Sequence, residues 1–262
     1  MDLRHAMIVE TRRQQRGLAA IVTESAELLG GVAGWAGPGA WANQAVGVGL
    51  SGPVTEAELD ALVAFYAARG APAKVEVLPI AHPTLVAGLA DRGFVVRRFE
   101  NLWLRELPAG EDLRARLTHG WPAGIELREL LPGEEELFTD VAGSGFVAPG
   151  ERMSEAERAV GLRMLEKPGV VAVFAWAGRE PAGAGSCAVD GEAAGLFGAT
   201  VLPEFRRRGV QQALIVDRME RLRARGAGVV CIESEPGHDT ERNAHRLGFE
   251  LAGTKVLLER PA

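Results

Sequence analysis

Cysteine, lysine and tyrosine are all rare in this sequence of 262 residues. The two cysteines, Cys187 and Cys231, lie far apart in apolar stretches, which predicts buried reduced thiols rather than a disulfide or a metal pair. Long apolar runs are absent too: no stretch approaches the roughly 18 apolar residues that a membrane span requires, and the N-terminus has no apolar core of signal-peptide length. We therefore expect a cytoplasmic protein without a membrane span.

Positive charge is also in deficit. The formal net charge of −6 at pH 7 argues against a general affinity for nucleic acid, because neutralising phosphates needs a basic surface. The hydrophobic fraction of 47% and the charged fraction of 24% are those of an ordinary globular protein. The length favours two domains of about 130 residues, each with its own core.

The most informative stretch runs from Gly195 to Leu222 and reads GLFGATVLPEFRRRGVQQALIVDRMERL. It passes from an apolar strand through a Pro-marked turn into a long helix. Arg206, Arg207, Arg208 and Gly209 stand at the helix start, where first-turn amide hydrogens lack partners and the helix dipole is positive. The loop is typical of a diphosphate-binding site; the alternative interpretation is a solvated basic turn.

This stretch resembles the cofactor motif of the GNAT family, the GCN5-related N-acetyltransferases, in which a strand ending V-x-P precedes Arg/Gln-x-x-Gly-x-Gly/Ala and a helix. Here the motif reads Val201-Leu202-Pro203 and then Arg206-Arg207-Arg208-Gly209-Val210-Gln211, with Gln211 in place of the last small residue. The order downstream is also similar to the family's: a strand at 229–232, a polar helix at 238–246, Gly248-Phe249 and a strand at 255–258. The combination indicates the family more strongly than the loop alone.

The resemblance implies an α/β fold, acetyl-CoA as co-substrate and direct transfer of acetyl to an amine, of an acceptor that we expect to be a small molecule. It implies that Ala199, Thr200 and Val201 hold the thioester, with a main-chain N–H near Val201 polarising the carbonyl. Asn243 would bind the pantetheine or phosphate arm. The remaining cofactor-binding residues would be Arg206, Arg207, Arg208, Gly209, Val210, Gln211 and Gln212.

The family's usual acid, a tyrosine just before the Gly-Phe, is missing: its position is Ala244, and the only tyrosine is Tyr66 in the other half. A thiol of pKa about 8.5 leaves tolerably as a thiolate without that acid. We name His245 as a replacement proton carrier, or else a surface histidine. Glu233 is the candidate base, or else a structural cap or salt-bridge partner. No metal site is expected, because the spacing of His238 and His245 fits no common metal motif.

An internal repeat relates the two halves. Ala68-Arg69-Gly70-Ala71 returns as Ala224-Arg225-Gly226-Ala227, and Gly93-Phe94 as Gly248-Phe249, both at a spacing of about 155 residues. So long a period indicates duplicated domains, which we place at residues 1–118 and 119–262; the alternative is two unrelated halves that share a helix stop by chance. The predicted fold is therefore α/β, as two tandem GNAT-like domains, each a mixed central sheet flanked by helices.

The first copy lacks the anion-binding loop. Its equivalent, Leu50 to Glu58, has no arginine and puts two glutamates in the first helical turn, which would repel a diphosphate. We interpret residues 1–118 as a degenerate copy that serves as a scaffold or as part of the substrate wall. Gly47 to Gly52 fits G-x-G-x-x-G, but the expected helix begins at Thr55 rather than at the third glycine, which argues against a dinucleotide fold. Ahead of it we expect a helix from Glu10 to Leu29.

Two functions remain open at this point. One is an N-acetyltransferase; the other is a CoA-binding module that has lost turnover and acts as a sensor or scaffold, which the vacant tyrosine position favours. The predicted partners are acetyl-CoA and an amine acceptor, with the protein a monomer or homodimer.

Overall fold

The computed structural model describes residues 2–148, 150–191 and 193–261. The strands in these residues form one mixed sheet of 11 strands in the order β1-β2-β3-β4-β11-β5-β10-β9-β8-β7-β6. The strands are β1 (Glu24–Leu28), β2 (Gly31–Trp35), β3 (Ala45–Val46), β4 (Ala73–Val77), β5 (Val95–Glu106), β6 (Ile125–Glu129), β7 (Val170–Ala177), β8 (Glu180–Asp190), β9 (Ala193–Val201), β10 (Val229–Ser234) and β11 (Glu250–Arg260). The helices are α1 (Leu3–Ile21), α2 (Glu56–Ala67), α3 (Pro83–Asp91), α4 (Glu135–Gly143), α5 (Glu155–Glu166), α6 (Val210–Ala224) and α7 (Asp239–Arg246), with short 3-10 turns η1 (Arg114–Arg116) and η2 (Pro203–Phe205).

The two halves repeat one arrangement, as the sequence predicted. In each half three strands pair antiparallel in succession, β1-β2-β3 and β7-β8-β9, and lead to a parallel pair, β3 with β4 and β9 with β10, whose members are connected by one helix. The second half has one additional antiparallel strand, β6, beside β7. The run α2, β4, α3, β5 returns as α6, β10, α7, β11 at a spacing of about 155 residues. The α/β fold and the tandem repeat are therefore both present.

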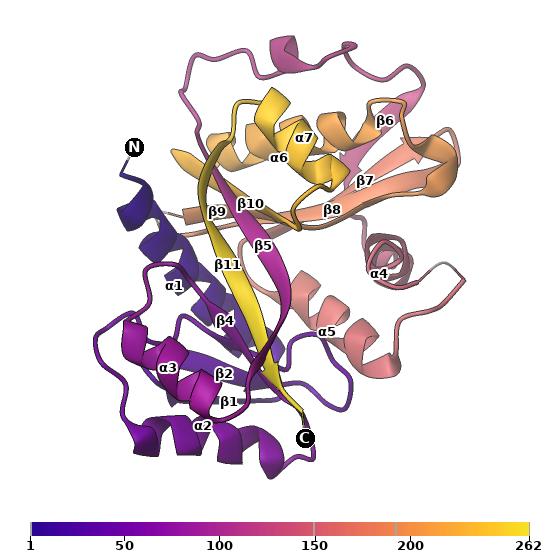
Figure 1. Cartoon of the computed structure of the whole chain (residues 1–262). Coiled ribbons are helices and arrows are strands. Elements are labelled where there is room, and N and C mark those ends of the chain that lie inside the picture. Colours follow the sequence, from indigo (N-terminus) through magenta and orange to yellow (C-terminus); the bar gives the residue numbers. More distant parts are fainter. Residues whose placement is uncertain (1, 149, 192, 262) are drawn as a thin grey trace.

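The sheets of the two halves are joined because each half gives its last strand to the centre. β11 lies between β4 and β5, and pairs with β4 from Val256 opposite Val77 to Arg260 opposite Ala73. β5 in turn pairs antiparallel with β10 of the second half. Figure 1 shows β5 and β11 side by side between the two groups of strands. The boundary predicted between residues 118 and 119 lies beyond β5, past η1, and stays a prediction.

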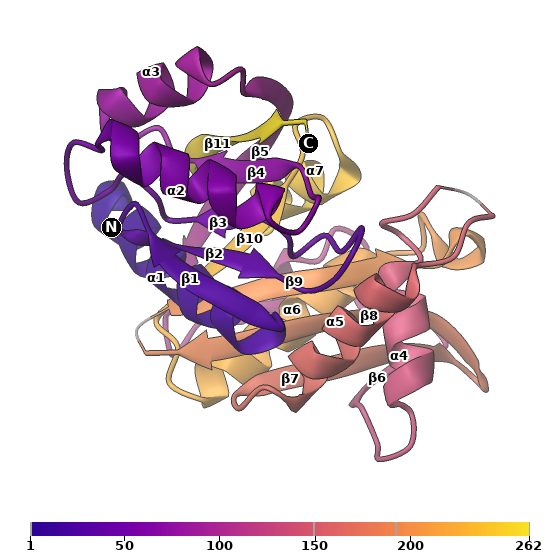
Figure 2. The same ribbon diagram turned by 90° about the horizontal axis from the view of Figure 1, so that it is seen from below.

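Different helices cover the two faces of the sheet. On one face, α6 and α7 bury Leu214, Ile215 and Ala244 against Val230 and Ile232 of β10. On the other face α4 contacts β8 and β9, and α5 contacts β7; Figure 2 shows α4 and α5 on one side of these strands and α6 on the other.

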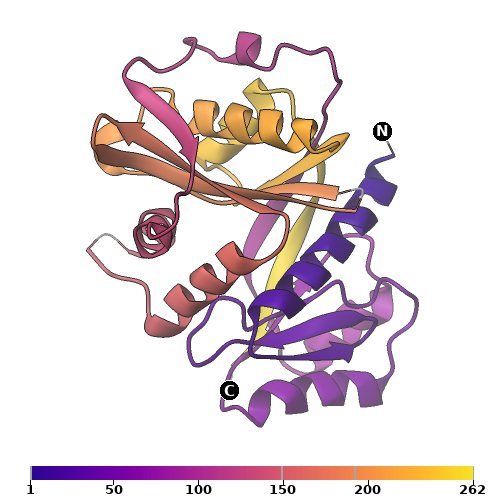
Figure 3. The ribbon, with the colours of Figure 1, turned by 180° about the vertical axis from the view of Figure 1, so that it is seen from behind.

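Helix α1 belongs to both halves. It contacts β2 and β3 of the first half and β9 and α5 of the second, and in Figure 3 it crosses the back of the sheet. Met7 packs with Leu78 and Leu102 of the first half and with Cys231 of the second. None of the described helices is both long enough and apolar enough to cross a membrane.

The helix expected from Glu10 to Leu29 is wrong in its second part. Asp2 caps α1, which ends at Ile21, and residues Glu24–Leu28 form β1 instead. Leu29 and Gly30 have φ of 56° and 72°, so the chain turns back as a hairpin into β2. Apolar residues that recur near helical spacing do not by themselves exclude a short strand.

Candidate functional site

The N-terminus of α6 has no side-chain cap. Its N-cap residue, Gly209, has φ 80° and Arg207 has φ 60°, and the first helical bond is that from Ala213 N–H to the Gly209 carbonyl at 3.0 Å. Within the described part of the chain, the N–H groups from Arg207 to Gln212 have no protein acceptor. Free amides in a left-handed loop at a positive helix end form a concavity suited to an anion. The side chains of Arg206, Arg207 and Arg208 are exposed around it.

The side chains predicted beside this loop are joined to one another. Gln211 Nε2 donates to Thr240 Oγ1 at 2.8 Å, and Asn243 Nδ2 donates to Gln211 Oε1 at 2.6 Å. Gln212 Nε2 donates to Asn243 Oδ1 at 2.9 Å, and its Oε1 accepts from Thr118 N–H. Both ends of the Asn243 amide therefore bridge α6 and α7, and it is the main chain of the loop that stays open to a ligand.

The equivalent helix start in the first half is closed. Thr55 Oγ1 accepts from Glu58 N–H, and the Glu58 carboxylate accepts from Thr55 N–H at 2.8 Å, which completes a capping box. The N–H and hydroxyl of Thr55 hold the pKa of Glu58 below its ordinary value. Ahead of it Gly49 N–H donates to Leu29 and its carbonyl accepts from His82. Side chains therefore accept from the N–H groups of Val54, Thr55 and Glu58, and two glutamates in the first turn repel a phosphate. Helix α2 begins at Glu56 instead of at the third glycine.

The end of β9 has hydrogen-bonding groups that face away from β8. Leu202 N–H donates to the Ala182 carbonyl at 3.0 Å, so Val201 and Gly183 form a non-hydrogen-bonded pair and the N–H and C=O of Val201 point toward β10. The parallel strands β9 and β10 pair only as far as Leu196 and Ile232. Val201 O instead accepts from Arg206 Nε at 3.1 Å, which ties the loop to the strand end.

A β-bulge precedes this strand end. Between the pairs Ser186–Phe197 and Ala184–Thr200 the ladder shifts by one residue, and Gly198 has φ 56°. Thr200 is buried, and its hydroxyl donates to the Ala142 carbonyl at the end of α4 at 2.6 Å. Of the three strand residues predicted to hold the thioester, Thr200 therefore has its side chain engaged elsewhere.

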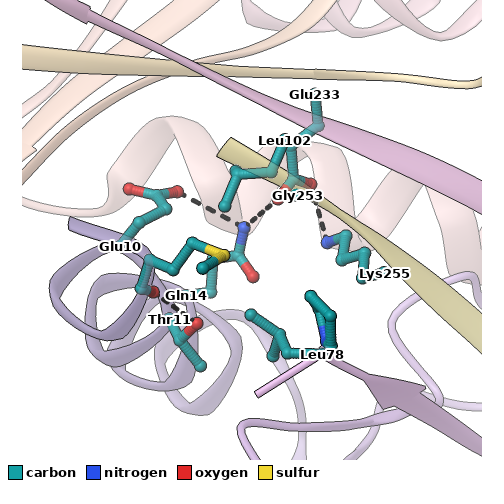
Figure 4. Close-up of a pocket in the computed structure, with 10 residues that line it drawn as sticks. Glu10, Thr11, Gln14, Leu78, Leu102, Glu233, Gly253 and Lys255 are labelled. Atoms are coloured by element: carbon teal, nitrogen blue, oxygen red, sulfur yellow. Dashed lines mark hydrogen bonds and ion pairs between the residues drawn. The ribbon is translucent and has the colours of Figure 1, made fainter. Parts of the chain in front are cut away.

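Glu233 lies on the face opposite α6. It alternates in β10 with Val230 and Ile232, which face α6, so it points toward α1. A small cavity with room for about one water molecule lies beside it. The cavity is lined by Met7, Glu10, Thr11, Gln14, Leu78, Pro79, Leu102, Glu233, Gly253 and Lys255. Figure 4 shows Gln14 and Lys255 both directed at Glu233.

Lys255 of β11 is the cation at the centre of this face. Its ammonium lies 2.8 Å from carboxylate oxygens of Glu76 and Glu233 and 3.3 Å from Glu100, with the side chain 5% exposed. Burial opposes the ionisation of Glu233, but Lys255 and the bond from Gln14 outweigh it, so the pKa of Glu233 lies below its ordinary value. Burial dominates at Glu100 and raises its pKa. Glu233 is therefore an ionised, ion-paired carboxylate.

The acids near β10 include three groups close enough for a metal. Among the described residues, ligand atoms of Glu10, Cys231 and Glu233 lie within 4.8 Å of one another. Glu10 already binds Arg13 at 2.6 Å, Glu233 binds Lys255, and burial raises the pKa of the Cys231 thiol. These partners occupy the carboxylates and keep the thiol protonated.

The vacant tyrosine position and the proposed proton carrier next to it differ in their exposure. Ala244 is fully buried in the core under α6, so the family's tyrosine position is filled by packing. The next residue, His245, is exposed on the last turn of α7. The sequence did not point to Gln14 and Lys255, which contact Glu233 from α1 and β11, or to Glu76 and Glu100, which contact Lys255 from β4 and β5. The sequence feature that could have pointed to this cluster is Lys255, a charged residue that alternates with apolar residues in β11.

A strand that separates from its parallel neighbour and continues into an uncapped, arginine-rich helix start is an arrangement suited to a small diphosphate ligand. Residues 135–249 match the model of the acetyltransferase (GNAT) family.

Solved structures agree on the fold. The chain is similar to a GCN5-related N-acetyltransferase from Kribbella flavida, with 20% identity, a TM-score of 0.70, and coverage of 98% of this chain and 95% of that one. It is also similar to a tandem GNAT protein from the clavulanic acid biosynthesis pathway, with 19% identity, a TM-score of 0.54, and coverage of 72% and 63%. The chain is also similar to a functionally unknown conserved protein from Staphylococcus epidermidis, with 12% identity, a TM-score of 0.57, and coverage of 80% of this chain and 81% of that one. No curated protein sequence matches the chain.

Proposed function

We propose that the protein is an N-acetyltransferase that moves acetyl from acetyl-CoA to the amine of a small acceptor, with the cofactor in the second half. The match of residues 135–249 to the family model supports acetyl transfer in general. The observation that carries the proposal is the contrast between two equivalent helix starts. The N-terminus of α6 has free amides and three arginines, whereas that of α2 is closed by Thr55 and Glu58.

In this proposal the diphosphate lies on the amides from Arg207 to Gln212, and the arm of the cofactor runs between the ends of β9 and β10. The N–H of Val201 points to that side and would donate to the thioester oxygen. The acceptor approaches on the α1 face of the sheet, the face on which Glu233 lies.

The reaction then needs few groups. The amine nitrogen adds to the thioester carbonyl, the carbon–sulfur bond breaks, and the sulfur leaves as a thiolate because a thiol of pKa about 8.5 is a tolerable leaving group. The proton from the amine passes to a base. Glu233 is our proposed base and His245 our proposed proton carrier; the ion pair with Lys255 makes Glu233 a weak base, suited as much to orienting an ammonium group.

Binding tests the proposed cofactor site. In isothermal titration with acetyl-CoA, Arg207→Glu should weaken binding about tenfold or more, because it puts a negative charge beside the phosphates. Arg179→Glu, the same change in the exposed turn between β7 and β8, is the matched control and should bind as the wild type does. Equal affinity in all three proteins would place the cofactor elsewhere.

The second candidate function is a CoA-binding module without turnover. The burial of Ala244 and the exposure of His245 favour it, because no acid then stands at the usual place. Thiol release from acetyl-CoA over a panel of small amines separates the two: release with any amine supports the enzyme, and tight binding without release supports the module. The small-molecule acceptor, the cytoplasmic location and a monomeric or homodimeric state stay predictions.

A further inference from the structure

Arg218 of α6 is a buried cation that the proposed reaction does not yet use. Its side chain is fully buried, and Nε donates to the Leu214 carbonyl of its own helix at 2.9 Å. Nη1 reaches the sheet and donates to the carbonyls of Ser186 at 2.8 Å and Phe197 at 3.3 Å. Nη2 is buried and has no partner in the described part of the chain.

The two carbonyls that Arg218 holds lie at the bulge of β9. Ser186 and Phe197 are the pair that borders the register shift, and Gly198 with its positive φ follows directly. A bulge disrupts the ladder locally and leaves carbonyls in need of other donors. Arg218 supplies that donor from behind the strand, just before β9 reaches Ala199 and Val201.

The surroundings make room for the guanidinium. A Cβ added to Gly185 would lie 2.9 Å from Cζ and Nη1 of Arg218 and 3.1 Å from Cβ of Ala199. The guanidinium thus lies against β8 and β9 at a position that a side chain on Gly185 would fill. The glycine has an ordinary negative or extended φ, so its need is for space and not for backbone freedom.

The charge of Arg218 is not neutralised by a hydrogen-bonded carboxylate. Asp217 is the adjacent acid, but its carboxylate is bonded to Arg221 at 2.6 Å. Burial lowers the pKa of Arg218 to about 10, which leaves it charged at neutral pH. An apolar side chain of similar length would fill this space without a desolvation penalty. The positive charge therefore calls for a function beyond packing.

We propose that Arg218 is a positioning residue for acetyl transfer: its guanidinium holds the bulge of β9 and makes the potential positive at the strand end where the thioester oxygen becomes negative. This inference rests on the proposed function. As the amine adds, the carbonyl π electrons move to that oxygen, and a fixed charge behind β9 stabilises it in a low-dielectric interior. The bond to the Phe197 carbonyl also polarises the peptide group that ends in Gly198 N–H.

Steady-state kinetics of Arg218→Met, Arg218→Lys and Gly185→Ala test the catalytic part, with Arg225→Met on the exposed end of the same helix as control. We expect kcat to fall about tenfold or more in Arg218→Met, with KM for acetyl-CoA changed less than about twofold. Arg218→Lys should recover part of kcat, and Arg225→Met should match the wild type. An unchanged kcat in Arg218→Met, or a rise confined to KM, would overturn the proposal.

A second measurement is independent of activity. In the ligand-free protein, amide NMR shifts from Phe197 to Val201 should move in Arg218→Met and in Gly185→Ala, which displaces the guanidinium without removing its charge, but not in Arg225→Met. Unmoved amides refute the positioning of the bulge even if turnover is slow. Absence of thiol release in the wild type refutes the proposed function instead, while the amide shifts still decide whether Arg218 holds the bulge.

Discussion

At the scale of single residues, Lys255 has the most consequential environment. Three carboxylates, from Glu76, Glu100 and Glu233, converge on its ammonium, and they belong to three different strands. Removing one partner of a buried ion cluster leaves the remaining charges without compensation, which costs far more than the cluster itself contributes.

Lys255→Met should therefore destabilise the protein by roughly 3–5 kcal/mol in urea unfolding. Lys74→Met is the matched control on the neighbouring strand β4, where the ammonium is partly exposed and lies 4.0 Å from Glu259. We expect the control to change stability by about 0.5 kcal/mol or less. A similar loss in both variants would contradict the special role of the buried cluster.

Glu100 predicts a pH effect of definite sign. Because burial raises its pKa in the folded state, the unfolded chain releases this proton first as pH rises above about 4.5. Between that pH and the raised folded value, ionisation of Glu100 makes unfolding easier. Glu100→Gln removes this ionisable group, so the free energy of unfolding of the variant, relative to that of the wild type, should increase as pH rises from 4.5 to 8. Urea unfolding across that range measures it; a difference that shrinks with pH would contradict the assignment.

The loop with free amides at the start of α6 was predictable from sequence, and the cavity beside Glu233 was not. Free amides at a helix start depend on residues next to one another, so Arg206 to Gly209 and the strand before them were sufficient to locate the loop. Alternation in β10 separates Glu233 from Val230 and Ile232 but does not show which helix it faces. Its partners Gln14 and Lys255 come from distant elements, and only packing reveals that they meet.

At the scale of elements, α2 and α6 occupy equivalent places with opposite N-terminal chemistry. Thr55→Ala breaks the capping box of α2 and should cost about 1 kcal/mol of stability without changing acetyl-CoA affinity. Ser154→Ala breaks the matching box of α5 and should behave alike. Denaturant unfolding and titration calorimetry measure the two effects. A loss of acetyl-CoA affinity in Thr55→Ala would mean that the first half takes part in cofactor binding.

Long elements were predicted well and short strands were not. α6 and α7 lie where the sequence predicted a long helix and a polar helix. The sequence did not predict β1 and β2, because Glu24–Leu28 continue the apolar spacing of α1 and Gly31–Trp35 has the composition of a Gly-rich loop. Position 31 in β2 requires a glycine because the backbone of β3 lies close to it, and a Cβ there would clash with the Val46 carbonyl oxygen.

At the scale of the whole molecule, the exchange of last strands makes each half depend on the other. Expressed alone, residues 1–118 lack β11 and residues 119–262 lack β5, so each fragment exposes long unpaired strand edges. We predict that neither fragment unfolds cooperatively alone and that the co-expressed fragments associate into a native-like complex. Circular dichroism and size-exclusion chromatography test this; cooperative unfolding of isolated 119–262 would contradict it.

The exchange itself could not be read from the sequence. A repeat of about 155 residues shows that β5 and β11 are equivalent, and equivalence is the same whether each strand stays in its own half or crosses to the other. The hydrogen bonds of β11 to β4 and of β5 to β10 settle the choice.

The last of the described strands, β11, is also one of the innermost. Until β11 has left the ribosome, β4 and β5 lack the strand that lies between them, and the sheet of the first half is incomplete. Translation normally lets an N-terminal unit fold before the next one appears. Here the sheet of the first half is completed only when residues 250–260, which follow the whole second-half sheet in the sequence, pair with β4 and β5.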